Sequence, residues 1–443
     1  MRKIKIAVAR VPFFYLPLIC AALFMLTLIL HYRVNTPFSD SWEMVPLFEA
    51  VSHHVLSLGD LWRQHNDHRI FFPNLVLLVS AYITNWNIGT EVIIGFLFSL
   101  ITATLIFLMI KKSIIKSWLG FLAGLLTATW FFSPVQWENW LWGWQVEWFM
   151  CIAGITTAFF LLLKYTNKSV KHKILLFVGA ILAAGIASFS LAGGLFVWLV
   201  GIIILLLMKQ PRKIQCIWLL LGTLSTFLYY YHYVQPPGPN DSTITFSLHH
   251  PIAFIHFFLA YLGAPIGSMN GQQQATIIIG SMLFLLLLPL LYLTWQRRNN
   301  VGKYLPWLML CLIGILGDLA TAVGRLSYGI GTADSSRYTA FSILYVIGLT
   351  VLAVALFDDL NKTSKNFRVI ATSGLILFSL PLLISSYSVG IKGFHSQSVL
   401  LNEIKTCTHV EHPSSTCLSL TYPNPSIALQ RLEYLKAKHW AGY

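Results

Sequence analysis

Charged side chains are scarce in this sequence of 443 residues. Only 10% of the residues are Asp, Glu, Lys or Arg, whereas 56% are hydrophobic and 14% are aromatic. The mean hydropathy is +0.68. So little charge excludes a soluble protein of several domains, and the composition instead indicates a polytopic membrane protein.

Repeats and a separate soluble domain are also missing. The sequence has no repeat of the solenoid type and no pair of inverted halves such as those that build many transporters. Its longest polar region is the C-terminal tail. We therefore expect one transmembrane domain over residues 1–387 and a small tail over residues 388–443.

Eleven apolar runs of about 17 to 23 residues are long enough to cross about 30 Å of hydrocarbon as helices. They cover residues 12–30, 90–110, 117–133, 146–163, 174–190, 193–208, 214–233, 273–295, 304–322, 338–357 and 369–387. The bilayer core offers the backbone no water, so each run must be helical. The prediction is an all-α protein with about eleven transmembrane helices. Segments 74–84 and 251–268 are too short or too interrupted to span, and we expect them to lie in the interface or to re-enter the membrane.

Basic residues gather in alternate connections between these runs. Six such connections hold 20 of the 30 basic residues. Because Lys and Arg are retained on the cytoplasmic side, we expect the N-terminus inside, and the first loop (31–72) and the tail outside. The first run lacks a small-x-small cleavage site before His31, so it is expected to remain as an anchor. The net charge of +14 then reflects topology and not nucleic-acid binding.

Cysteine is rare as well. Four of the six cysteines lie in or beside apolar runs, where Cys commonly fills space as a small apolar residue. Cys407 and Cys417 share the tail, and an oxidising compartment would let them form a disulfide. The alternative is two free thiols. Apolar positions between Ile427 and Trp440 predict that the tail is partly helical.

The few ionisable side chains are crowded in the first loop, where Asp40 is best placed for chemistry. It follows the first apolar run by about ten residues, so we expect it near the membrane surface, within reach of a lipid head group. A carboxylate there can accept a proton from a sugar hydroxyl, and Glu43 could act as a second acid or bind a metal ion. The alternative is that Asp40 caps a surface helix that begins at Ser41.

The same loop carries the run His65-Asn-Asp-His-Arg69. His65, His68 and Asp67 form a weak candidate for a metal site. The planar guanidinium of Arg69 is suited to binding a phosphate group. The alternative for Arg69 is an interfacial cation whose charged head reaches toward water.

Two arginines late in the chain depart from the pattern in which basic residues lie in the inner connections. Arg325 and Arg337 flank a glycine-rich loop on the expected outer side. With the hydroxyl and backbone N–H groups of that loop, they could bind an anion. The alternative is structural pairing, of Arg325 with Asp318 or of Arg337 with Asp334.

Five tryptophans lie within the twelve residues 137–148. The preference of Trp for membrane interfaces accounts for much of this cluster. The rest could be a platform on which sugar rings stack, with Glu138, Asn139, Gln145 and Glu147 meeting the hydroxyl groups. The candidate residues for binding sugar, acceptor or metal are Glu43, Asp67, His68, Trp137, Glu138 and Trp140.

The layout resembles that of the GT-C superfamily of membrane glycosyltransferases. The resemblance covers the whole chain, with an N-in first helix, Asp40 soon after it, interfacial segments in the first loop and about eleven spans. The pairing of Asn66-Asp-His-Arg-Ile70 with Ser335-Ser-Arg-Tyr338 resembles uncharacterised bacterial members. The length and short tail are similar to the serotype-converting O-antigen glucosyltransferases. The chain departs from protein O-mannosyltransferases and oligosaccharyltransferases, because it has neither an Asp-Glu pair in the first loop nor a Trp-Trp-Asp motif.

This resemblance implies an inverting transfer of a sugar, such as glucose, from a polyprenyl-phosphate donor. The acceptor would be a periplasmic glycan or a lipid-linked oligosaccharide such as the O-antigen of lipopolysaccharide. Asp40 would be the general base, and Arg69, Arg325 and Arg337 would stabilise the leaving phosphate. Metal dependence varies within the superfamily, so Mg²⁺ or Mn²⁺ is an optional cofactor. Undecaprenyl-type lipids and membrane lipid are the expected partners, and nucleic acid is not.

Other classes of membrane protein stay open as alternatives. An O-antigen polymerase or ligase would also be polytopic, but its large loop usually comes later in the chain. A transporter would place ionisable groups or broken helices near the midplane of the membrane. A membrane O-acyltransferase would need a catalytic His with access to a cytoplasmic acyl donor, whereas the histidine clusters here lie in expected outer loops.

Overall fold

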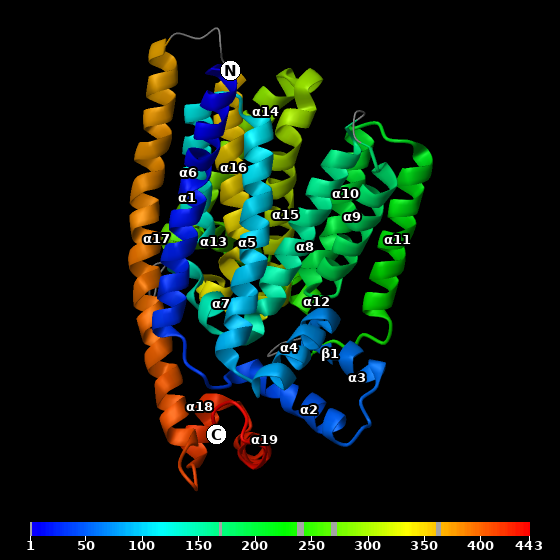
Figure 1. Ribbon diagram of the computed structural model, residues 1–443, viewed down its shortest axis with the longest axis vertical. Helices are drawn as coiled ribbons and strands as arrows, with labels where there is room; N and C mark the ends of the chain where they lie inside the picture. Colours follow the sequence, from blue (N-terminus) through cyan, green and yellow to red (C-terminus); the bar gives the residue numbers. More distant parts are fainter. Residues whose placement is uncertain (1, 168–170, 237–242, 267–272, 360–364) are drawn as a thin grey trace.

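The protein is a bundle of helices. The computed structural model describes residues 2–167, 171–236, 243–266, 273–359 and 365–443. The bundle is elongated, with the N-terminus near one end and the C-terminus near the other (Figure 1). Within the described residues the only strands are β1 (Gln64–His65) and β2 (His68–Arg69), which pair antiparallel in one hairpin. The predicted all-α class is confirmed.

Within the described residues, eight helical segments are long and apolar enough to cross a membrane. They fall on α1 (Arg2–Tyr32), α5 (Ile88–Ser113), α6 (Ser117–Phe131), α8 (Val146–Tyr165), α14 (Gln273–Gln296), α15 (Val301–Arg325), α16 (Thr339–Asp359) and α17 (Lys365–Thr408). The three other expected spans form helices that fall outside these eight: α9 (Lys173–Ser188), α10 (Phe196–Leu207) and α11 (Arg212–Tyr230). The chain is thus a multi-pass membrane protein, with eight spans by length and composition where the sequence predicts eleven.

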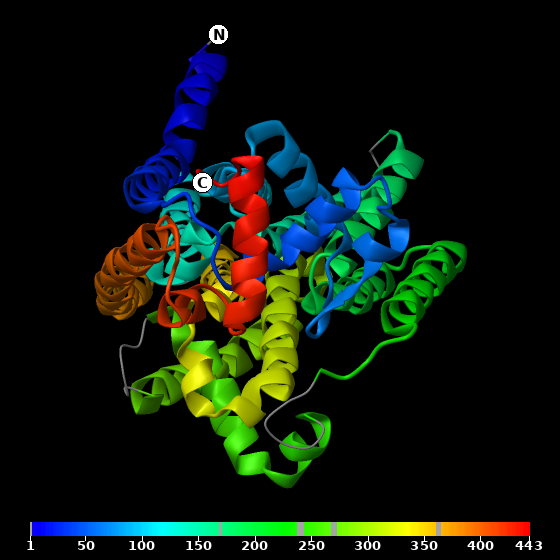
Figure 2. The same cartoon turned by 90° about the horizontal axis from the view of Figure 1, so that it is seen from below.

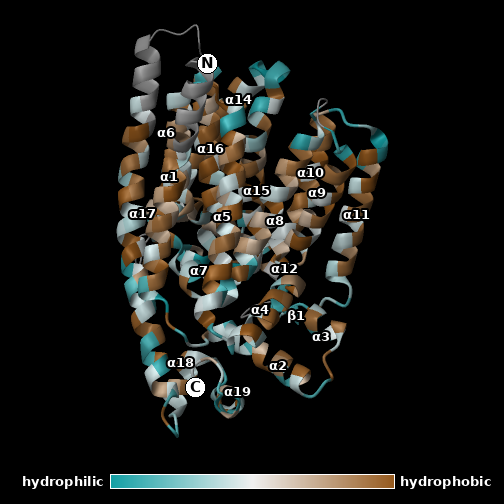
Figure 3. Cartoon of the chain, viewed as in Figure 1, coloured by the Kyte–Doolittle hydropathy of each residue, from teal (hydrophilic) through white to brown (hydrophobic). Residues whose placement is uncertain are grey.

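The two ends of the bundle carry different residues. We call the end with the first loop and the tail the loop end, and the opposite end the basic end. At the basic end Lys112, Lys164 and Lys303 line one cavity of about 700 Å³, and Lys303 forms ion pairs with Asp358 and Asp359. Basic clusters from alternate connections therefore meet at one end, as expected for helices that alternate in direction. Apolar residues dominate the length between the ends (Figure 3).

The first loop folds into short elements at the loop end. They are η1 (Ser39–Met44), α2 (Val45–Ser52), α3 (Leu58–Trp62), the β1–β2 hairpin and α4 (Phe71–Thr84). The helix α4 contains the short apolar segment 74–84, and its 14 residues are too few to span a bilayer. The other short segment forms most of α13 (Pro251–Gly263), which follows α12 (Thr243–His249), and residues 267 and 268 lie outside the described residues.

Close packing of α15 against α16 fixes the turn between them. A Cβ on Gly314 would lie 2.7 Å from Cβ of Tyr345, and one on Gly317 would lie 2.4 Å from the ring of Phe341. Such contacts are too short for any larger residue, so glycine permits this approach. The turn carries η7 (Leu326–Tyr328), η8 (Ile330–Asp334) and η9 (Ser336–Tyr338), and the helix pair holds it at the loop end.

The tail is a continuation of α17 and not a separate unit. This helix runs without a break through residues 387 and 388, where the sequence suggests a boundary. The apolar pattern ends there because the helix leaves the apolar part of the bundle, and the helix itself continues to Thr408. The helices α18 (Ser415–Thr421) and α19 (Pro425–Lys438) follow.

The tail packs against the first loop. A disulfide joins Cys407 at the end of α17 to Cys417 in α18. The ring of Trp440 lies 5.0 Å from the rings of Phe48 and Tyr82, measured between centroids. Viewed from the loop end, α19 lies across the bundle beside the first loop (Figure 2). The tail and the first loop therefore share one small apolar core.

Candidate functional site

Asp40 lies in the turn of 3-10 helix η1 that follows α1. Phe38 precedes this turn, and no side chain caps it, so Asp40 does not cap a surface helix as the alternative prediction had it. The neighbouring Ser41 and Trp42 are buried, and the indole Nε1 of Trp142 donates a hydrogen bond to Oγ of Ser41 at 3.0 Å. The turn is thus anchored directly after Asp40, whose carboxylate stays partly exposed at 32%.

The β1–β2 hairpin places two histidines beside Asp40. Side chains alternate between the two faces of a strand, and His65 and His68 are direct cross-strand partners on one face. Nε2 of His65 lies 3.7 Å from Oδ2 of Asp40. Asn66 has a φ of 47°, the left-handed conformation that the tight turn of the hairpin requires. The hairpin thus brings His65 and His68 side by side.

Burial controls the protonation of His68. It lowers the pKa of His68 to about 3, with smaller contributions from the charges of Arg325 and His65. The imidazole is therefore neutral at physiological pH, and its Nδ1 lies 3.4 Å from the backbone N of Ala192, from which it accepts a hydrogen bond. In the described part of the chain no group of three or more His, Cys, Asp or Glu side chains is arranged to hold a metal ion, so we derive no step through one.

The turn between α15 and α16 contributes two arginines. Nη2 of Arg325 lies 3.2 Å from Oδ2 of Asp67 on the hairpin. This ion pair joins the turn between α15 and α16 to the first loop. Asp318, the partner considered from the sequence, instead accepts hydrogen bonds from Ser342 at 3.0 and 3.1 Å. Arg337 follows on η9, where its backbone N–H donates to Oε2 of Glu138 at 2.9 Å.

These side chains line one pocket at the loop end, which we call the acid–arginine pocket. Its volume is about 300 Å³. The charged and imidazole groups in its wall are Asp40, Glu147, Arg325, Arg337, His65 and His68. Its aromatic side chains are Trp144, Trp148, Tyr328 and Tyr338. The structure thus brings Asp40 together with the two late arginines, which are almost 300 positions away in the sequence.

Three buried polar atoms around this pocket lack a protein partner. They are Oε2 of Glu147, Oε1 of Gln145 and Nε of Arg337, none of which has a hydrogen bond within the described part of the chain. Glu147 and Gln145 are only 6% and 2% exposed. Leaving such groups unsatisfied is costly. All three belong to residues in the pocket wall, so these atoms are available for hydrogen bonds with water or with a polar ligand.

Asp40 is ionised at physiological pH. Burial raises the pKa of its carboxyl, but the hydrogen bond and charge of His65 and the charges of Arg337 and Arg325 lower the pKa by more. The net pKa lies below the ordinary value of 3.8. The pocket therefore presents a carboxylate that can accept a proton, opposite two cations that can bind a negative group.

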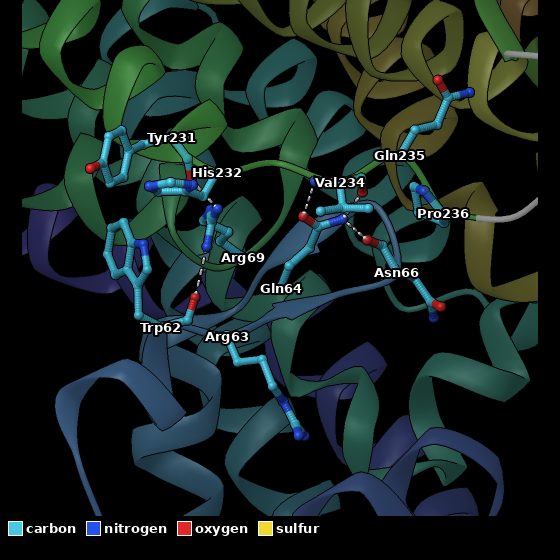
Figure 4. Close-up of a pocket in the computed structure, with 10 residues that line it drawn as sticks. All are labelled: Trp62, Arg63, Gln64, Asn66, Arg69, Tyr231, His232, Val234, Gln235 and Pro236. Atoms are coloured by element: carbon cyan, nitrogen blue, oxygen red, sulfur yellow. Dashed lines mark hydrogen bonds between the residues drawn. The ribbon is translucent and has the colours of Figure 1, made fainter.

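Arg69 does not belong to this pocket. Its guanidinium donates from Nε to the carbonyl of Tyr229 at 2.6 Å, from Nη1 to the carbonyl of Trp62 at 3.0 Å, and from Nη2 to the carbonyl of Tyr231 (Figure 4). Burial lowers the pKa of Arg69, which is only 4% exposed. The expectation that Arg69 binds the donor phosphate is therefore revised: backbone carbonyls occupy its donors, and it ties the hairpin to the end of α11.

Glu43 also points away from the pocket. Its Oε1 accepts hydrogen bonds from Tyr422 and, at 2.9 Å, from Nη1 of Arg431, both in the tail. Its Oε2 lies 3.5 Å from Arg63. Asp67 is engaged by Arg325 outside the pocket wall. Neither carboxylate is thus placed as a second acid beside Asp40.

The tryptophan cluster divides between structure and pocket. Trp140 in α7 (Trp137–Leu141) is 1% exposed, and its Nε1 donates to the carbonyl of Ser133. A Cβ on Gly393 would lie 2.1 Å from Cδ1 of Trp137, so this ring packs tightly on α17. The carboxylate of Glu138 accepts a hydrogen bond from the backbone N–H of Arg337. Trp137, Glu138 and Trp140 therefore lie outside the wall of the acid–arginine pocket.

The pocket uses the end of that cluster instead. Trp144 in η3 (Gly143–Gln145) and Trp148 in α8 lie in its wall, together with Glu147. Gln145 and Glu147 are two of the residues that the sequence predicts to meet sugar hydroxyl groups, and both lie in the pocket wall. Glu147 stands in the first turn of a long apolar helix, where burial of an acidic group is costly.

Comparison with known proteins does not identify this chain. No protein-family model matches the sequence, and no curated protein matches it significantly.

Proposed function

We propose that this protein is an inverting glycosyltransferase that moves a sugar from a polyprenyl-phosphate donor to an extracytoplasmic glycan. The observation that carries the proposal is the acid–arginine pocket, in which Asp40 faces Arg325 and Arg337 at the loop end of a membrane bundle. Aromatic rings in the wall suit the faces of a sugar. The unpartnered polar atoms of Gln145 and Glu147 suit its hydroxyl groups.

The proposed reaction is a single displacement at the anomeric carbon. The acceptor hydroxyl oxygen forms the new bond to this carbon while its proton passes to Asp40, and the bond from the carbon to the phosphate oxygen breaks. The phosphate leaves with the bonding electron pair and gains one negative charge. Arg325 and Arg337 stabilise that charge in a pocket with little water, where fixed cations act strongly.

The membrane arrangement is part of the proposal. The basic end would face the cytoplasm and the loop end the periplasm of a bacterial inner membrane, following the distribution of Lys and Arg. Nucleotide sugars are not available there, so a lipid-linked donor is the suitable substrate. The GT-C resemblance adds the expectation of a GT-C fold, and the length and tail add that of an O-antigen acceptor.

The test is transfer by the purified protein in lipid nanodiscs, with polyprenyl-phosphate glucose and other polyprenyl-phosphate sugars. Asp40→Asn keeps the size of the side chain but removes the base, and we expect it to lower transfer about 100-fold or more. Asp60→Asn is the matched control, because Asp60 caps the exposed helix α3 away from the pocket. Full transfer by Asp40→Asn would refute the assignment.

A second variant tests the buried carboxylate. Glu147→Gln retains the shape of the side chain and replaces its carboxyl group with an amide. We expect at least a tenfold loss of transfer, because Oε2 is available to a substrate and not used by the protein. Wild-type transfer in this variant would mean that the unpartnered atom has no role in the reaction.

A further inference from the structure

A second cavity lies on the other face of the β1–β2 hairpin. We call it the hairpin cavity. Its volume is about 590 Å³, within the usual range of ligand pockets of about 300–1,000 Å³. Trp62, Tyr231 and His232 gather on one side of it, and Asn66 and Gln235 lie on the other (Figure 4).

The hairpin is the wall between this cavity and the acid–arginine pocket. Because side chains alternate along a strand, Gln64 and Arg69 face the hairpin cavity, whereas their neighbours His65 and His68 face the acid–arginine pocket. Asn66 at the tip of the hairpin lines both. A ligand that passes over this tip would therefore occupy both sites.

The chemistry of the hairpin cavity fits a carbohydrate. Its wall combines aromatic rings, which pack on the apolar faces of sugars, with amide groups that donate and accept hydrogen bonds. None of the described residues that line it is acidic, and Val234 and Pro236 are its only aliphatic ones. Polar side chains, which include Arg63 and Arg69, interrupt the aromatic surface of this wall.

The volumes of the acid–arginine pocket and the hairpin cavity indicate which part of the ligand each would bind. The acid–arginine pocket, at about 300 Å³, is at the lower limit of ligand pockets, so an oligosaccharide must extend beyond it. We propose that the hairpin cavity binds the part of the acceptor glycan that lies beyond the sugar residue receiving the transfer. This inference rests on the proposed function, and it makes the enzyme selective for long acceptors.

The test compares two neighbouring tyrosines. Tyr231 and Tyr230 are each 54% exposed, but only Tyr231 lines the hairpin cavity. Tyr231→Ala keeps the backbone carbonyl that Arg69 binds, and Tyr230→Ala is its matched control. Acceptors are fragments of the host O-polysaccharide with one or with several repeat units, and both variants are first checked for monodispersity and thermal unfolding.

With fragments of several repeats, we expect Tyr231→Ala to lower kcat/KM about five- to tenfold through a higher KM. Its kcat/KM for single-repeat fragments should equal that of wild type, and Tyr230→Ala should match wild type on both. Equal kinetics of the two variants on long fragments would overturn the inference. So would a lower affinity of Tyr231→Ala for polyprenyl phosphate with unchanged dependence on acceptor length, which would indicate a lipid site.

A binding measurement separates this inference from the proposed function. If wild type transferred no sugar from any polyprenyl-phosphate donor, the proposed function would fail, and binding of the long fragments to protein in nanodiscs would decide the role of the cavity. Binding to wild type that is weakened only by Tyr231→Ala would support a glycan site. No binding, or equal binding to both variants, would overturn it.

Discussion

The contact between Glu43 and Arg431 should hold the tail on the first loop, and Arg431→Met tests this. Oε1 of Glu43 lies 2.9 Å from Nη1 of Arg431, and the two side chains are 18% and 13% exposed. At an effective dielectric constant of about 20, the gross attraction of such a pair is about 4–6 kcal/mol, most of which desolvation cancels. A hydrogen bond to a charged group contributes about 1.5–3 kcal/mol net.

We therefore expect Arg431→Met to destabilise the protein by about 2 kcal/mol. The cost stays below that of an isolated buried charge, because Tyr422 and Arg63 still accompany Glu43. In detergent the midpoint of thermal unfolding should fall on the order of 2–4 °C, and the tail should become more sensitive to trypsin. Lys438→Met is the matched control, since it removes the same charge from an exposed site on α19.

The lowered pKa of Glu43 predicts how the stability difference between wild type and Arg431→Met changes with pH. Burial raises the pKa of Glu43, but the hydrogen bonds from Tyr422 and Arg431 and the charge of Arg431 lower it below the ordinary value of 4.5. A carboxyl whose pKa is lowered by folding stabilises the folded state above its unfolded pKa, and this contribution is lost as the pH falls through the folded pKa. The difference between wild type and Arg431→Met should be full at pH 7 and shrink below about pH 4.5. Equal stability of Arg431→Met and Lys438→Met at pH 7, or a difference that persists in acid, would refute the reasoning.

Three further predictions follow from other contacts. Arg69→Lys should destabilise the protein by about 2–3 kcal/mol in thermal unfolding, because an ammonium cannot reach three backbone carbonyls at once; an effect confined to the KM of the donor would favour phosphate binding instead. Asp67→Asn should lower transfer about tenfold with little change in stability, because the pair with Arg325 at 3.2 Å is partly exposed and orients the guanidinium; unchanged transfer would contradict this. Reduction of the disulfide, or Cys407→Ser with Cys417→Ser, should cost about 2–3 kcal/mol for a closed loop with a sequence separation of 10, and equal proteolysis of the tail with and without reductant would argue against it.

The sequence predicted what depends on local pattern. Apolar runs located the helices, because a bilayer admits few other backbone structures. The number of spans differs from the prediction, because some apolar runs form helices too short to cross a membrane. The run at residues 193–208 forms α10, which has only 12 residues. Residue 387 marks the end of an apolar run and not the end of a helix, because hydropathy records where a helix leaves the apolar zone, and α17 continues past that point.

The candidate site was predictable where unusual charge placement was the signal. Asp40, Arg325 and Arg337 stood out because ionisable groups are rare, and they share one pocket. Arg69 and Glu43 carried the same signal but have partners that the sequence could not reveal. The carbonyls that bind Arg69 include one 160 residues later, on Tyr229, and the tail groups that bind Glu43 lie more than 370 residues away. Only the tertiary fold distinguishes a charge that is already paired from one available to a ligand.

The charges of the acid–arginine pocket explain why its two arginines could act at different stages of the proposed reaction. Arg325 is already engaged by Asp67 at 3.2 Å, whereas Nε of Arg337 has no partner within the described residues. In the proposed reaction, a donor phosphodiester carries one negative charge and needs one additional cation, which Arg337 would supply. When the sugar leaves, the phosphate gains a second charge, and Arg325 can then share its guanidinium between Asp67 and the product. Stabilisation that grows along the reaction favours the transition state over the bound substrate, so Arg325→Ala should lower kcat more than it raises the KM of the donor, and Arg337→Ala should affect both.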